Sequence, residues 1–112
     1  MQIGSQNFDL EISDTNETRE LGLMYREIMQ YNEGMIFVFD TLGRHRFWMK
    51  NTLIPLDILW LDEEKSIFHF ETVNPCYEDP CPPVGPTSGN AKYVIELPAG
   101  SFFEEIGTVV EF

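Results

Sequence analysis

Short apolar runs, each bounded by glycine, proline or charged residues, are the feature that most constrains how this chain can fold. Residues 35–39 (MIFVF) are apolar throughout, which is typical of a strand covered on both faces. Residues 56–61 are apolar except for Asp57, and the charged turn 62–65 leads into a second strand over 66–73. Runs of this length are shorter than ordinary helices, so they predict a sheet that contains a hairpin.

The rest of the chain adds further strands and little helix. By the same patterning, strands are predicted over residues 8–12, 44–51, 91–97 and 108–112. A short helix is expected to begin at Asp14 or Thr15, with Glu17 at the capping-box spacing from Asp14. Ser101 and Glu104 repeat that spacing for a second short helix. The predicted fold class is therefore mainly β, of the α+β type: a small antiparallel barrel or half-barrel of six to seven short strands with one or two short helices.

Prolines mark one long connection. Five of the seven prolines fall within residues 74–90, together with two glycines. Because proline cannot donate a ladder hydrogen bond, this stretch is predicted to be a loop, and at about 17 residues it is long for a connection. Such a loop can cover one mouth of a barrel. A chain of 112 residues is long enough for one domain and too short for two, so residues 1–112 are expected to form a single domain.

The charge balance limits the partners. There are 19 aspartates and glutamates against seven lysines and arginines, which gives a formal net charge of -12. A negative field repels phosphate backbones, so nucleic acid is not an expected partner. No apolar run approaches the roughly 20 residues that cross a bilayer, and no membrane span is expected. With 43% hydrophobic residues the chain is nevertheless expected to fold.

Four segments resemble, in the same order, a family of small prokaryotic proteins called domain of unknown function 192. The segments are 18–26 (TRELGLMYR), 34–39 (GMIFVF), 47–57 (FWMKNTLIPLD) and 93–100 (YVIELPAG). The resemblance covers nearly the whole chain. It implies a compact, mostly β domain that is often found behind an export signal or a lipoprotein anchor, which favours an exported or cell-envelope location. It implies no established biochemical function, and the ligand, the partner and the oligomeric state are left unassigned.

Polar residues within or beside apolar strands are the main candidate site. An ionised carboxylate in an apolar strand is costly without a partner, so Asp57 is expected to pair with Lys50 or Asn51. The same polar set can line a cleft for a small polar or anionic ligand, or for a peptide segment of a partner protein. Its members are Arg26, Trp48, Lys50, Asn51, Asp57 and Glu96. The alternative is a network that only stabilises the fold.

Positive charge is concentrated in one segment. If residues 44–51 form a strand, alternation places Arg44, Arg46, Trp48 and Lys50 on one face. Arginine can grip a carboxylate or phosphate through two hydrogen bonds, so this face would attract a small anion. The alternative is that these cations pair with carboxylates on neighbouring strands.

An enzyme is the less favoured interpretation. Asp57 and Glu96 could act as general acid and base of a hydrolase if both faced one cavity. The sequence contains no phosphate-binding G-x-x-x-x-G-K-[ST] loop, no G-x-S-x-G nucleophile elbow and no H-E-x-x-H zinc motif. No residue is therefore assigned a catalytic role.

The two cysteines lie five residues apart in the proline-rich loop. Cys76 and Cys81 can close a small ring, and a disulfide is the first interpretation. Two free thiols are an alternative. A metal clip would need further ligands from His45, His69 or Asp79, because two thiolates make only half of a tetrahedral site.

The methionines provide a last alternative. Met24, Met35 and Met49 fall in three of the four segments of the family resemblance. Thioethers are soft ligands that suit Cu(I), so a copper-binding envelope protein is one possibility. Methionine is also an ordinary core residue. No metal or other cofactor is assigned from the sequence.

Overall fold

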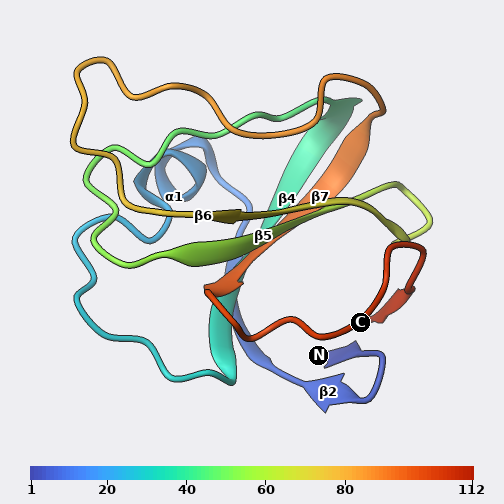
Figure 1. Cartoon of the computed structure of the whole chain (residues 1–112). Helices are drawn as coiled ribbons and strands as arrows, with labels where there is room; N and C mark the ends of the chain where they lie inside the picture. The colour runs from blue at the N-terminus through green and yellow to red at the C-terminus, as the bar shows by residue number, and fades with distance from the viewer.

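The computed structural model describes residues 1–112 as two open sheets and one short helix (Figure 1). The larger sheet has the order β3-β4-β7-β5-β6, with β3 (Asp9–Ser13), β4 (Glu33–Gly43), β5 (Leu56–Leu61), β6 (Ile67–Val73) and β7 (Ala91–Pro98). The smaller sheet has the order β2-β1-β8, with β1 (Gln2–Ile3), β2 (Gln6–Asn7) and β8 (Val110–Glu111). The helix is α1 (Asn16–Leu21). The mainly β, half-barrel form of the fold prediction is confirmed, whereas a closed barrel is not formed.

The centre of the large sheet is antiparallel, and its edge strand β3 is the exception. β3 pairs with β4 in parallel, while β4 with β7, β7 with β5 and β5 with β6 are all antiparallel. Parallel neighbours need a crossover connection, and here α1 and the segment 22–32 supply it. The crossover places α1 beside the sheet (Figure 1). All six residues of β5 are buried, as its apolar run predicts.

The two faces of the large sheet carry two separate apolar clusters. One cluster includes Leu59, Ile95 and Leu97 and packs against Ile3 and Val110 of the small sheet. The other cluster packs against the segment after α1 and the segment between β4 and β5, and its members include Leu23, Phe37, Met49, Ile58 and Trp60. Consecutive residues of a strand face opposite sides, so β5 and β7 contribute to both clusters.

The prediction of a strand over residues 44–51 is wrong. This segment forms only an isolated bridge between Phe47 and Val84, outside the named strands. Its alternating pattern resembles a strand, but His45 and Asn51 have φ values of 47° and 59°, in the left-handed region that no strand residue adopts. The predicted single face of Arg44, Arg46, Trp48 and Lys50 is therefore not formed. In Figure 1 the segment runs beside the proline-rich loop, which the bridge joins to it.

The ends of two predicted helices differ in part from expectation. Thr15, one of the two expected caps, is the cap of α1, but the Asp14–Glu17 capping box is wrong: Thr15 and Thr18 form the box, because each hydroxyl accepts a hydrogen bond from the other residue's backbone N–H. The helix predicted from Ser101 is wrong: residues 101–105 have no regular secondary structure, and a turn follows at 106–107. Glu104 instead accepts hydrogen bonds from the backbone and hydroxyl of Ser5, which ties the turn to the β1–β2 hairpin.

The proline-rich loop and its disulfide are as the sequence predicts. Residues 74–90 contain no named strand or helix. Cys76 and Cys81 are bonded to each other, with Cα atoms 5.9 Å apart. The bond removes both thiolates as metal ligands. Nowhere in the chain are three His, Cys, Asp or Glu side chains gathered as metal ligands would be. Likewise, no helix has both the length and the apolar character needed to cross a membrane.

Asp57 stabilises the fold at a junction of three segments. Its carboxylate accepts a hydrogen bond from the Thr72 hydroxyl at 2.7 Å and from the backbone amides of Gly100 and Phe102 at 3.0 and 3.1 Å. The side chain is buried. The partners expected from the sequence, Lys50 and Asn51, make no hydrogen bond to it. A buried carboxylate needs donors, and main-chain amides supply them here.

Replacing Asp57 should therefore destabilise the protein more than removing one of its donors. Asp57→Ala leaves two amides without their acceptor and should lower the free energy of unfolding by about 2–4 kcal/mol. Thr72→Val removes a single hydrogen bond and should cost about 1 kcal/mol. Urea denaturation of both variants measures the difference. Equal losses in the two would contradict this role for Asp57.

Candidate functional site

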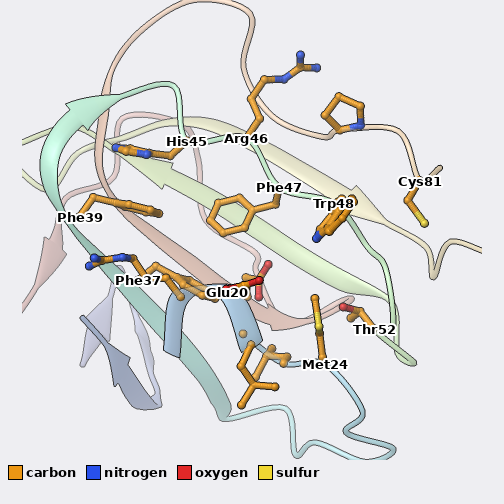
Figure 2. A pocket seen from close by; sticks show the side chains of 16 residues that line it. Glu20, Met24, Phe37, Phe39, His45, Arg46, Phe47, Trp48, Thr52 and Cys81 are labelled. Atoms are coloured by element: carbon orange, nitrogen blue, oxygen red, sulfur yellow. The ribbon is translucent and has the colours of Figure 1, made fainter. Parts of the chain in front are cut away.

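A cavity of about 510 Å³ lies over the sheet face that carries Phe37, between α1, the segment 45–52 and the loop near Cys81. We call it the Glu96 cavity, because the side chain of Glu96 reaches it from β7. Figure 2 shows the rings of Phe37, Phe39 and Phe47 together, with Trp48 toward Cys81 and Arg46 extended outward. The lining is thus mixed: four aromatic rings and other apolar side chains share it with the polar or charged residues Arg19, Glu20, His45, Arg46, Thr52 and Glu96.

Gly22 lets the end of α1 approach the floor of the cavity. Its φ of 51° lies in the left-handed region, where a side chain is strained. A β-carbon at this position would lie 3.4 Å from the Phe37 ring and 3.9 Å from a carboxyl oxygen of Glu96. The glycine therefore ends the helix and leaves space beside Glu96.

The aromatic side of the cavity is held by contacts with the sheet. The ring centroids of Phe37 and Phe47 are 5.2 Å apart, and the imidazole of His45 stacks on Phe39 at 3.7 Å. The indole N–H of Trp60 donates to the His45 carbonyl at 3.0 Å. These contacts fix the irregular segment after β4 to β5 and β4, so the cavity has a defined shape without regular structure on that side.

Glu96 is the polar group at the floor of the cavity. Its side chain is 5% exposed and makes no hydrogen bond or ion pair within the chain. Its strand neighbours in register are Met35 and Ile58, both apolar. Burial raises the pKa of Glu96 from the ordinary 4.5 to about 8, because the ionised form is poorly solvated there. At neutral pH the group is therefore mostly a neutral acid, with donor and acceptor capacity that the protein does not use.

The charged side chains at the mouth of the cavity differ in how many of their interactions are made within the chain. The Arg19 guanidinium donates to the Val38 carbonyl at 2.6 Å and to the Asn16 side chain at 2.9 Å. It also lies 3.6 Å from Asp40 and 5.6 Å from the centroid of the Phe39 ring. Arg46 is exposed and makes no ion pair, and Glu20 is exposed on α1. The mouth thus carries both signs of charge.

The structure brings together only two of the six residues proposed from the sequence. Trp48 and Glu96 both line the Glu96 cavity. The ammonium of Lys50 lies 5.2 Å from the Trp48 ring, outside the lining. Asn51 donates to the Tyr25 hydroxyl at 2.9 Å.

Arg26 lies elsewhere. It forms an ion pair with Glu11, and both line a second hollow between β3 and the segment before β4. The pairing lowers the pKa of Glu11, chiefly through the hydrogen bond from the guanidinium. Two charges that satisfy each other have a structural role, so this hollow is the weaker candidate for a site.

The proposed acid–base pair is not formed. Asp57 is in register with Leu97, whereas Glu96 is in register with Ile58. Residues opposite each other share a face, so Asp57 and Glu96 extend to opposite sides of the sheet. They cannot act on one substrate in one cavity.

Sequence reasoning did not find the aromatic side of the cavity. Phe37, Phe39 and Phe47 resemble core residues in the sequence, because no local pattern distinguishes an aromatic residue that lines a cavity from one in the core.

The three methionines considered as copper ligands lie in different places. Met35 and Met49 are buried in one apolar cluster, and Met24 lines the cavity.

The comparisons with known proteins give a family and a fold. The model of the DUF192 family, described as "Uncharacterized ACR", matches residues 1–111. No curated protein sequence matches the chain. The chain therefore belongs to the DUF192 family, which is a family of small proteins without an assigned activity.

Two solved structures are similar. One is a protein of unknown function from Novosphingobium aromaticivorans, with a TM-score of 0.82 and 29% identity, over 94% of this chain and 75% of that one. The other, from Sinorhizobium meliloti, is provisionally described as a transcription regulator. It has a TM-score of 0.74 and 31% identity, over 84% of this chain and 70% of that one.

All four segments on which the family resemblance rests reach the Glu96 cavity. The first contributes residues 19–24, the second Phe37 and Phe39, the third Phe47, Trp48 and Thr52, and the fourth Glu96. These segments are far apart in the sequence. Their convergence on one cavity makes it the candidate functional site.

The buried acid should make stability depend on pH. Between pH 4.5 and about 8 the unfolded chain has released the Glu96 proton and the folded chain has kept it. The contribution of this group to the free energy of unfolding is therefore greatest below pH 4.5 and falls by about 1.4 kcal/mol per pH unit through that window. Glu96→Gln has no titrating group at this position, so its free energy of unfolding should not fall in this way. The stability of the variant relative to that of the wild type should therefore increase as the pH rises. Urea denaturation at several pH values measures this, and a constant difference would contradict it.

Proposed function

We propose that this protein is a binding module for a small ligand, and that the ligand occupies the Glu96 cavity. The observation that carries the proposal is a buried carboxyl group without a protein partner, open to a cavity with four aromatic rings. The carboxyl oxygens of Glu96 are not sealed in the core but reach the cavity, so they are available to a group from outside the chain. A ligand with one polar group and an apolar body would hydrogen-bond them.

The size and composition of the cavity support a small molecule. A volume of about 510 Å³ lies within the range of ordinary ligand sites, roughly 300–1,000 Å³. Aromatic rings provide contact area at little cost in side-chain entropy, since each has two rotatable bonds. The remaining lining groups include the Thr52 hydroxyl and the exposed guanidinium of Arg46. These groups can add polar contacts at the mouth.

Binding is favoured over catalysis by the surroundings of Glu96. Catalytic sites usually pair an acid or base with a nucleophile or with a second group that orients it. Glu96 has apolar neighbours in register and no hydrogen bond to a histidine, a nucleophile or another carboxyl. A buried acid at the floor of a partly aromatic cavity is suited to recognising a polar group.

The test uses aromatic fragments as probes, because the ligand is unidentified. Backbone amide NMR spectra are recorded with benzylamine, benzyl alcohol or benzoate. At least one fragment should bind with a Kd of about 1 mM and shift the resonances of residues 19–24, 45–48 and 96. Trp48→Ala should weaken that binding about tenfold, through lost ring contact.

A matched control separates the cavity from general surface adhesion. Tyr77 is 91% exposed and lies outside the Glu96 cavity, so Tyr77→Ala should leave binding unchanged. Shifts scattered over the surface, or confined to the hollow beside Arg26, would contradict the proposal. Equal effects of the two substitutions would do the same.

A further inference from the structure

We propose that the polar group recognised at the floor of the cavity is a protonated amine, so that the Glu96 cavity selects organic ammonium compounds over neutral or anionic compounds of the same shape. The inference rests on the proposed function, because it specifies the ligand class of that site.

The first argument is the supply of hydrogen-bond donors. The carboxyl group of Glu96 accepts no hydrogen bond within the chain, and its register neighbours Met35 and Ile58 have no donors in their side chains. Arg19 of the lining uses its guanidinium on Val38 and Asn16, and none of the other lining donors, such as Thr52 or Arg46, bonds Glu96. The carboxyl group therefore has no donor from the chain, and an ammonium group brings three of them.

The second argument is the aromatic lining. The face of an aromatic ring attracts a cation within about 6 Å of its centroid. Two rings of this cavity already interact with cations of the protein: the Arg19 guanidinium lies 5.6 Å from the Phe39 centroid, and the Lys50 ammonium 5.2 Å from that of Trp48. Phe37 is fully buried and His45 stacks on Phe39, so a ligand cation would reach the more exposed rings of Phe47 and Trp48. An anion would gain nothing from those ring faces.

The third argument is the wider electrostatic field. The chain has a formal net charge of -12, which raises the local concentration of small cations. α1 ends at Gly22 beside the floor, so the negative end of its dipole is on this side of the cavity. Arg19, Arg46 and Lys50 oppose a cation, but Arg19 is offset by Asp40, and Arg46 and Lys50 are exposed to solvent. One carboxyl group is too few ligands for a metal ion, which leaves an organic cation.

Binding of an ammonium group should be coupled to proton release. The ligand favours the ionised carboxylate, whereas burial keeps Glu96 protonated until its pKa of about 8. One proton then leaves Glu96 for the buffer as the ligand binds, and the affinity should rise about tenfold per pH unit up to about pH 8. The other titratable or charged groups around the cavity are Arg19 and Glu20 on α1, and His45 and Arg46 after β4.

The experiment is isothermal titration calorimetry of the wild-type protein with benzylamine, benzyl alcohol and benzoate. The three compounds share a ring and differ in charge. Benzylamine should bind about tenfold more tightly than benzyl alcohol near pH 8, and benzoate more weakly than either. Buffers of different ionisation enthalpy should show release of close to one proton per benzylamine at pH 7.

Two substitutions assign the effect to Glu96. Glu96→Gln should remove both the preference for benzylamine and the proton release, while benzyl alcohol still binds. Glu63→Gln removes an exposed carboxylate outside the Glu96 cavity, with the same change of net charge. It should retain the preference and the proton release, because Glu63 has no contact with the site.

The outcomes separate the inference from the function on which it rests. Benzyl alcohol binding as tightly as benzylamine, or affinity for benzylamine that does not change between about pH 6 and about pH 8, would overturn the ammonium inference and leave the binding function in place. Failure of all three compounds to bind in the cavity would overturn both.

Discussion

Burial of both faces of β5 and β7 is the constraint on which the rest of this structure depends. The two strands lie side by side near the middle of the large sheet, and each needs apolar cover above and below. The small sheet covers one face, and the segments around α1 and after β4 cover the other. Because this second cover is irregular, it does not fill the space completely. The cavity therefore lies at the point where an irregular layer meets a regular sheet.

The regular part of the fold is predictable from the sequence because it depends on local patterns. The apolar runs at 35–39 and 56–61 form β4 and β5, and the prolines of 74–90 exclude strands there. The segment 44–51 has the alternation of a strand but does not form one. Its turns depend on positive φ at His45 and on the contact of Trp60 with the His45 carbonyl. Such a long-range contact is not visible in local periodicity.

The site was predictable only in part, because alternate residues of a strand face opposite sides of the sheet and the sequence alone does not show what covers each side. Asp57 and Glu96 are equivalent in sequence, each a carboxyl residue within an apolar run. The register of β5 and β7 directs them to opposite faces. On one face main-chain amides of the turn 99–102 reach Asp57, and on the other an open cavity reaches Glu96. A single sequence identifies both residues as unusual, but only the packing distinguishes a structural carboxylate from a candidate binding group.

Burial of the Glu96 carboxyl group also means that the proposed binding function and the stability of the fold make opposite demands on this residue. An aliphatic side chain at position 96 would bury apolar surface and remove the cost of holding a polar group without a partner. An aliphatic substitution at position 96 is therefore among the changes that a search for more thermostable variants would select. The gain would come with the loss of the only ionisable group on the floor. A local loss of stability at one residue is thus the cost that the proposed binding function would impose on this fold.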